Sequence, residues 1–309
     1  MTEMQKYLAE EVAEDLADGI ITRREAMRRL GLMGITGAGA AALLTAFAEP
    51  AAAAGSGGRG HGHHVGASAT EWAPVATEEI TFAGPAGTLM AAWAPAAKPR
   101  GGVLVIHENR GLNAHIRQVA GRFAAVGWSA LALDLLSRRG GTGAFPTEAE
   151  VTAALNELAA TPEVFDADMK AAITELAERL GRHADLAAIG FCFGGGMVWR
   201  LLASTEPRLA AAAPFYGPFP AGGSLEGNRA AVLGVYGGLD ARVNATRPAA
   251  QAALEAARLE HELLTFTAAD HAFFNDTNPA RFNAPAAAEA WRRVVGWFEA
   301  ARKDRGRGH

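Results

Sequence analysis

The stretch LAAIGFCFGGGMVWRLLA, residues 186–203, decides the fold of this 309-residue chain. It begins with a short apolar run typical of a buried strand and ends with a segment of helical character. Gly190 and Gly194 flank Cys192, the only cysteine of the sequence, in a G-x-C-x-G pattern. This pattern predicts a sharp turn from strand to helix with Cys192 at its tip, because larger side chains at the glycine positions would collide there.

The chain around this stretch alternates apolar runs with amphipathic segments from about residue 71 onward. We predict a hairpin over 78–95 and then buried strands within 101–108, 128–136, 186–192, 209–217, 230–238 and 261–269. Helical spacing lies between them, at 115–127, 148–159, 163–180, 196–203, 247–259 and 286–301. Such alternation indicates an α/β fold with a mostly parallel central sheet and helices on both faces.

The composition is that of an ordinary globular protein that needs no disulfide. Hydrophobic residues make up 50% of the chain and charged residues 20%, with a net charge of −4. Nucleic-acid binding would need a basic patch to neutralise phosphates, and the charge balance argues against one. A single cysteine also excludes any disulfide within the chain.

Residues 1–54 have the layout of an export signal. Arg23 and Arg24 precede the uncharged stretch 30–47, and the small residues 51–54 follow. This order resembles a twin-arginine signal, which is read by the export machinery and predicts a periplasmic or extracellular protein. The alternative is a retained amphipathic helix or membrane anchor, because residues 4–20 have helical apolar spacing. In that case the protein stays cytoplasmic or membrane-anchored.

A Gly- and Ser-rich segment, residues 55–71, separates this region from the predicted domain, residues 72–309. Such composition is typical of a flexible linker. His61, His63 and His64 could hold a metal ion weakly, but no carboxylate or cysteine stands beside them. A solvated linker is therefore the favoured interpretation.

Polar residues at the carboxyl ends of the predicted strands are the candidate site, because parallel sheets bind ligands at that edge. Cys192, Asp240 and His271 follow one another in the chain order nucleophile, acid, base. His271 would take the proton of Cys192, and Asp240 would orient the imidazole. The N-terminus of the helix that follows the turn should also lower the pKa of the thiol. The backbone N–H of Phe193 is placed to bind an oxyanion. Three alternatives remain: Asp240 is a turn residue, His271 is a satisfied core histidine, or Asp270 replaces Asp240 as the partner of His271.

Five segments together resemble the dienelactone hydrolase family, which has the α/β-hydrolase fold and a cysteine nucleophile. They are VIHENRGLN, LALDLLSR, GFCFGGG, GGLDARVN and DHAFFND, within residues 77–301. The resemblance implies hydrolysis of a small-molecule ester or enol-lactone through a thioester, without metal or cofactor. It also implies that Glu108 controls the ionisation of the thiol and that Asn109 gives a second oxyanion N–H. An ion pair of Glu108 with Arg110 or Arg117 is the alternative role.

Four residues are expected to contact the substrate: Arg138, Asn275, Arg110 and Tyr216. The resemblance places Arg138 on a substrate carboxylate, whereas Asn275 stands where the family has a second arginine. Arg110 is a candidate to compensate, and Tyr216, at a strand end, is a further substrate-binding candidate. The Gly-rich segment 138–151 is either a lid or an ordinary surface loop. A general short-chain carboxylesterase or thioesterase, or a redox-sensing module based on Cys192, are the competing functions.

Overall fold

An eight-stranded sheet forms the centre of the computed structural model, which describes residues 1–48 and 73–307. The strand order is β1-β2-β4-β3-β5-β6-β7-β8. β2 runs antiparallel to both of its neighbours, and all pairs from β4 to β8 are parallel. The strands are β1 (Glu78–Gly84), β2 (Gly87–Ala94), β3 (Gly101–Ile106), β4 (Trp128–Leu133), β5 (Leu186–Phe191), β6 (Leu209–Phe215), β7 (Ala231–Gly237) and β8 (His261–Phe266).

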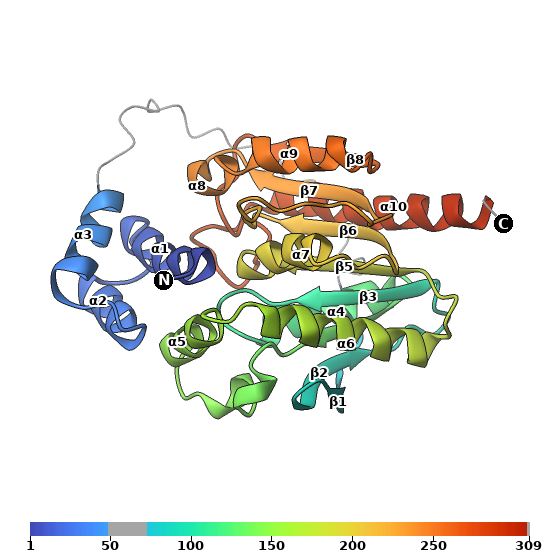
Figure 1. Ribbon diagram of the computed structural model, residues 1–309, viewed down its shortest axis with the longest axis horizontal. Coiled ribbons are helices and arrows are strands. Elements are labelled where there is room, and N and C mark those ends of the chain that lie inside the picture. The colour runs from blue at the N-terminus through green and yellow to red at the C-terminus, as the bar shows by residue number, and fades with distance from the viewer. Residues whose placement is uncertain (49–72, 308–309) are drawn as a thin grey trace.

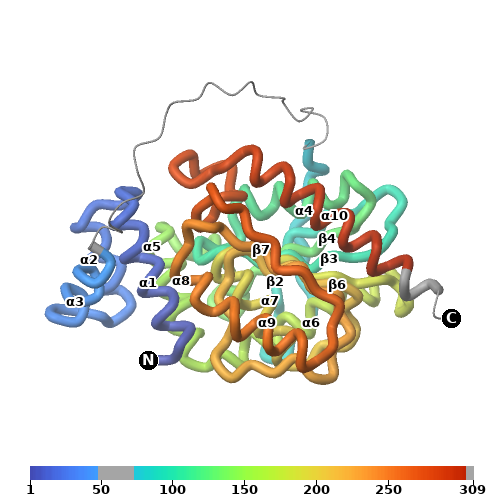
Figure 2. Tube along the Cα trace, turned by 90° about the horizontal axis from the view of Figure 1, so that it is seen from above, coloured from blue at the N-terminus to red at the C-terminus, as the bar shows by residue number. Residues whose placement is uncertain are grey.

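Helices cover both faces of this sheet. α4 (Ala114–Ala125) and α10 (Ala284–Arg307) pack on one face, where the ring of Phe123 contacts Trp291. α6 (Glu163–Leu180) and α7 (Phe193–Ala203) pack together on the other, as the view in Figure 2 shows. The remaining helices of the domain are α5 (Glu148–Leu158), α8 (Ala241–Asn244), α9 (Arg247–Ala256) and the 3₁₀ turns η1 (Ser137–Arg139) and η2 (Thr142–Ala144). The predicted α/β fold is confirmed.

The inner strands are apolar throughout because both faces of the sheet are covered. Every residue of β3, β4, β5, β6 and β7 is buried. The predicted elements agree with the structure except at some ends. α7 begins at Phe193, three residues before the predicted helix, because the glycines after Cys192 already form its first turn. α10 extends from Ala284 to Arg307, beyond the predicted 286–301.

The first 48 residues form three helices that pack against the domain. α1 (Glu3–Ala17), α2 (Arg23–Leu32) and α3 (Gly37–Ala48) share a small apolar core that includes Val12, Leu30 and Leu44. They lie beyond the carboxyl ends of the strands, beside α5 and α8 (Figure 1). This packing differs from a signal segment that simply precedes a folded domain.

Within residues 1–48 and 73–307, no helix is both long and apolar enough to cross a membrane. The predicted linker 55–71 with His61, His63 and His64, and the small residues 51–54, lie outside the described residues.

Candidate active site

Cys192 occupies a strained turn between β5 and α7. Its backbone has φ 55° and ψ −118°, a conformation that non-glycine residues rarely adopt. The backbone N–H of Cys192 donates to Phe215 O at 3.0 Å, which fixes the turn to the end of β6. A Cβ on Gly190 would collide with the carbonyl of Gly194, and a Cβ on Gly194 would lie 2.6 Å from His107 O. The close approach of backbone therefore explains the two glycines of the G-x-C-x-G pattern.

His271 and Asp240 lie next to this turn and form a buried pair. His271 Nδ1 lies 2.7 Å from Asp240 Oδ2, and both residues are 1% exposed. The other carboxylate oxygen of Asp240 accepts from the N–H of Val243 and caps α8. Asp270 instead accepts from the backbone N–H of His271 at 2.7 Å. The partner of the imidazole ring is thus Asp240, and Nε2 is left facing Cys192.

The two backbone groups predicted to bind an oxyanion belong to the start of α7 and to the loop after β3. Phe193 is the first residue of α7, so its N–H has no acceptor one turn earlier in the helix. Asn109 lies in the loop after β3, and its carbonyl accepts from Thr152 Oγ1 of α5 at 3.0 Å. His107 anchors the same loop, because its Nε2 accepts from Leu135 N at 3.1 Å. The loop after β3 is therefore fixed by α5 on one side and by the segment after β4 on the other.

Glu108 is buried near the thiol and is held by Asn275. Asn275 Nδ2 donates to Glu108 Oε2 at 2.7 Å, and Glu108 is only 4% exposed. The two arginines considered as its partners are engaged elsewhere: Arg117 with Glu79 at 3.0 Å, and Arg110 with Glu148 at 3.7 Å. Asn275, expected on the substrate, is thus in contact with the candidate site through Glu108.

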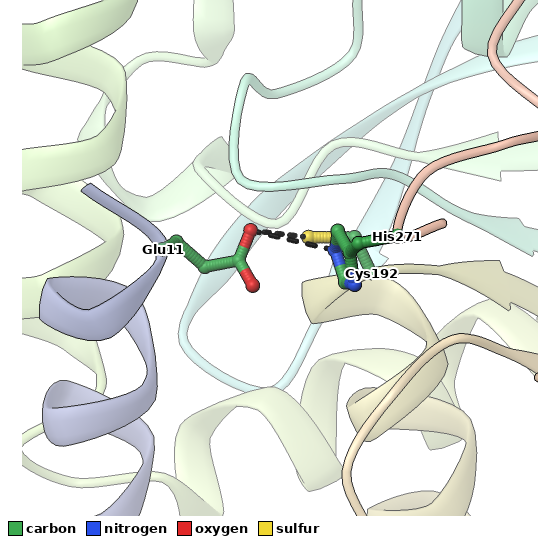
Figure 3. A group of neighbouring side chains, drawn as sticks. All are labelled: Glu11, Cys192 and His271. Atoms are coloured by element: carbon green, nitrogen blue, oxygen red, sulfur yellow. Dashed lines mark hydrogen bonds and ion pairs between the residues drawn. The ribbon is translucent and has the colours of Figure 1, made fainter. Parts of the chain in front are cut away.

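Helix α1 covers the candidate site, a contact that the sequence patterns did not predict. Tyr7 and Glu11 of α1 reach Cys192: Tyr7 Oη donates to Cys192 Sγ at 3.4 Å, and Sγ donates to Glu11 Oε2 at 3.3 Å. Glu11 Oε2 also lies 3.4 Å from His271 Nε2. Figure 3 shows the Glu11 carboxylate pointing from α1 straight at Cys192 and His271.

A signal for this contact exists in the sequence. Glu3, Tyr7, Glu11 and Asp15 recur every four residues and share one face of α1. The opposite, apolar face is the one that suggested an amphipathic helix.

Burial under α1 raises the pKa of Cys192 to about 11, and the nearby Glu11 carboxylate adds to the rise. The sequence-based prediction of a lowered thiol pKa is therefore wrong for this structure. The dipole of α7 is present, but burial and Glu11 outweigh it. Burial also acts to lower the pKa of His271, yet Glu11 and Asp240 hold it well above its usual value.

The same cluster is the group of described residues that could hold a metal ion. The ligand atoms of Glu11, Cys192 and His271 lie within 4.8 Å of one another and are buried. Carboxylate, thiolate and imidazole are donors that suit Zn²⁺. Arg242 already binds the other oxygen of Glu11 and supplies a positive charge next to it.

The remaining predicted substrate contacts have different surroundings: Arg138 is paired with Asp168, and Tyr216 is fully buried beside His271. Arg138 forms two hydrogen bonds with the buried Asp168, at 2.7 and 2.8 Å. The ring of Tyr216 contacts the His271 ring edge-on, with 5.2 Å between centroids. In the segment 138–151, Thr142 is bound by Asp134 through its N–H at 2.6 Å and its hydroxyl at 2.9 Å. This segment is tied to the end of β4.

A cavity of about 360 Å³ lies between α1 and the domain. Its lining includes Tyr7 and Glu10 of α1 on one side and Phe193, Met197 and Arg242 on the other. The domain surface is therefore concave beneath α1, next to the turn at Cys192. A volume of this size suits a small-molecule ligand.

Residues 89–302 match the Dienelactone hydrolase family. The chain belongs to this family. The match begins at residue 89, so α1, α2 and α3 lie outside it. Membership in the dienelactone hydrolase family makes the protein a hydrolase that acts on ester or lactone bonds.

Relatives and solved structures of the family resemble the same part of the chain. A protein of Escherichia coli O157:H7 named "Putative carboxymethylenebutenolidase" is 32% identical over 212 residues, which cover 64% of this chain and 76% of that protein. The crystal structure of a "Putative Dienelactone Hydrolase" from Klebsiella pneumoniae subsp. pneumoniae MGH 78578 has a TM-score of 0.60 and 29% identity, covering 72% of this chain and 98% of that one. A dienelactone hydrolase-like promiscuous phosphotriesterase from metagenomic libraries, at 24% identity and a TM-score of 0.64, shares the fold over 74% of this chain and 99% of its own.

Proposed function

We propose that this protein hydrolyses an ester or enol-lactone through a thioester formed on Cys192. The observation that carries the proposal is the strained turn that sets Cys192 beside the buried His271–Asp240 pair. A nucleophile, a base within reach and a carboxylate that orients the base are the three parts that acyl transfer requires.

In the proposed reaction His271 Nε2 takes the proton of Cys192, and the thiolate attacks the substrate carbonyl. The N–H groups of Phe193 and Asn109 hold the developing oxyanion; losing one such donor typically costs on the order of 100-fold in rate. The tetrahedral intermediate collapses as His271 gives its proton to the leaving oxygen. His271 then takes a proton from water as its oxygen attacks the thioester. The second tetrahedral intermediate expels the Cys192 thiolate, which takes the proton back from His271 as the acid leaves. Glu108 acts on the ionisation of the thiol from its place beside it.

The test compares Cys192→Ala and Cys192→Ser with the wild type on an enol-lactone and a p-nitrophenyl ester. We expect Cys192→Ala to abolish turnover, and mass spectrometry of the wild type to show an acyl group on the chain. Full activity in Cys192→Ala would overturn the proposal. An Arg138→Ala variant tests the substrate class: a selective loss on anionic esters would show that Arg138 leaves Asp168 to bind a carboxylate. Equal rates would favour a general carboxylesterase or thioesterase.

A redox-sensing role for Cys192 receives little support. Sensor thiols have low pKa values and are open to solvent. Cys192 is 3% exposed and its pKa is raised, so it has neither property.

We also propose that residues 1–54 direct export through the twin-arginine machinery. Arg23 and Arg24 are exposed at the start of α2, where a receptor can read them. Replacing both by lysine should keep the protein in the cytoplasm of its native host. N-terminal sequencing of the protein from that host should find a start near residue 55, and an intact N-terminus on the exported protein would contradict removal of the segment.

A further inference from the structure

We propose that the mouth of the active site carries a carboxylate-binding site formed by Arg242 and Arg281, and that α1 occupies it as an internal inhibitor. The inference rests on the proposed function in naming Cys192 as the nucleophile. It concerns a segment that lies outside the residues matched by the family.

The acyl position of the site is filled by α1. A reacting carbonyl carbon must come within about 3–3.5 Å of the attacking atom. Glu11 Oε2 already lies 3.3 Å from Cys192 Sγ and 3.4 Å from His271 Nε2. No substrate carbonyl can take this place while Glu11 is there. The acid released by hydrolysis would also present a carboxylate at this position, so Glu11 stands where the reaction product forms.

The arginines explain why a carboxylate is stable so deep in the site. Arg242 binds Glu11 and lies 2.7 Å from Glu14 Oε2, with its guanidinium 4.5 Å above the Tyr7 ring. Arg281 Nη2 lies 2.6 Å from Asp18 and 3.4 Å from Asp15. Across residues 1–48 and 73–307, each ion pair of Arg242 and Arg281 is made with α1 or with Asp18, its C-terminal cap.

The charges are complementary over the whole contact. The face of α1 toward the domain carries the carboxylates of Glu11, Glu14 and Asp15, whereas the domain presents arginines. Both arginines are largely buried, at 15% and 5% side-chain exposure. These exposures hold with α1 docked, and buried cations without partners are costly, so the carboxylates of α1 pair the charges that its docking removes from water. Departure of α1 would leave both arginines and the concave surface below them open to another carboxylate.

Contacts at the start of α1 hold it in register. Thr2 Oγ1 donates to Ala159 O at 2.8 Å, and Gln5 Nε2 donates to Asn156 O at 3.1 Å, both at the end of α5. Leu8 is fully buried in the main core. These contacts define one docking position for α1, in which Glu11 meets Cys192.

The experiment measures alkylation of the only thiol of the full-length chain, which needs no hydrolytic activity. Iodoacetamide modification of Cys192 is followed by intact mass for wild type, Glu11→Lys and Glu178→Lys. Glu11→Lys places a cation against Arg242 and His271. Glu178 is exposed on α6, away from α1, so Glu178→Lys makes the same charge change outside the contact. We expect Glu11→Lys to label about tenfold faster or more, since opening frees the thiol. Glu178→Lys should stay within about twofold of wild type.

A second opening variant and a second reagent complete the test. Asp15→Lys, which faces Arg281, should also accelerate labelling, and circular dichroism checks that both variants keep the folded domain. In the Glu11→Lys chain, Arg242→Gln should lower the ratio of iodoacetate to iodoacetamide rates by about threefold, because the anionic reagent loses its cation. An unchanged ratio would overturn the arginine site.

The outcomes separate this inference from the proposed hydrolase activity. If wild type labels as fast as folded Glu11→Lys, α1 does not close the site and the inference is overturned, whatever the esterase assay shows. If Glu11→Lys labels faster but hydrolyses no ester or lactone, the inference stands and the proposed function fails. If labelling and hydrolysis rise together, both are supported.

Discussion

Replacement of Asp240 by Asn tests the base of the proposed triad most directly. Both oxygens of Asp240 accept hydrogen bonds, Oδ1 from Val243 N at 3.0 Å and Oδ2 from His271 Nδ1 at 2.7 Å. An Asn offers one acceptor and one donor group in this place. If it keeps the cap on α8, its NH₂ faces Nδ1 and forces the proton onto Nε2, the atom that must accept from Cys192. The imidazole then cannot act as a base.

We expect Asp240→Asn to lower kcat/KM on a p-nitrophenyl ester by on the order of 10³-fold, or about 4 kcal/mol of transition-state stabilisation. The assay is run in the wild-type and Glu11→Lys chains, so that each comparison has the same state of α1. Asp270→Asn is the matched control: it keeps an acceptor for the N–H of His271 and should stay within about threefold. Retention of activity within tenfold in a folded Asp240→Asn protein would refute this role of Asp240.

Three further predictions concern stability and ionisation. Gly194→Ala should destabilise the fold by about 1–3 kcal/mol, because its Cβ would meet backbone carbonyls. Gly296→Ala, on the open side of α10, should stabilise the fold by up to about 1 kcal/mol. Thermal unfolding of the two variants and the wild type checks both values. Iodoacetamide labelling of Cys192 in wild type should rise about tenfold per pH unit up to a pKa of about 11, and a plateau near pH 8 would contradict the closed site. The hydrogen bond with His115 is the largest cause holding the pKa of Asp276 at about 2. The ionised Asp276 therefore contributes its full stability above about pH 4 and loses it as the pH falls toward 2. Asp276→Asn should flatten the dependence of the free energy of unfolding on pH in that range.

The turn at Cys192 and its nearness to Asp240 and His271 could be predicted because their constraints are local or follow from topology. Gly190 and Gly194 are required by contacts within a few residues of Cys192 or with the adjacent strand. Asp240 and His271 follow β7 and β8, which end at the same edge of the sheet as β5. Alternating apolar segments were enough to place those strands.

The contacts that the sequence analysis missed join distant segments through single side chains. Asn275 reaches Glu108 across 167 positions, and α1 meets Arg242 across more than 220. No periodicity encodes such partners. The thiol pKa was predicted from α7 alone, without the helix that covers it. Burial is a property of the assembled structure, and here it reverses the effect of the local helix dipole.

The covalent attachment of α1 to the domain sets how strongly it needs to bind. A tethered ligand experiences an effective concentration on the order of millimolar. With an intrinsic dissociation constant of about 10 μM, α1 would occupy the site about 99% of the time, at any dilution of the protein. After a single cut in the chain between α3 and β1, the same helix at 1 μM would occupy only about a tenth of the sites. Contacts that are too weak to hold a separate helix can therefore keep the site closed in the intact chain. A single proteolytic cut would open the site, and the cleaved helix would not close it again at low concentration.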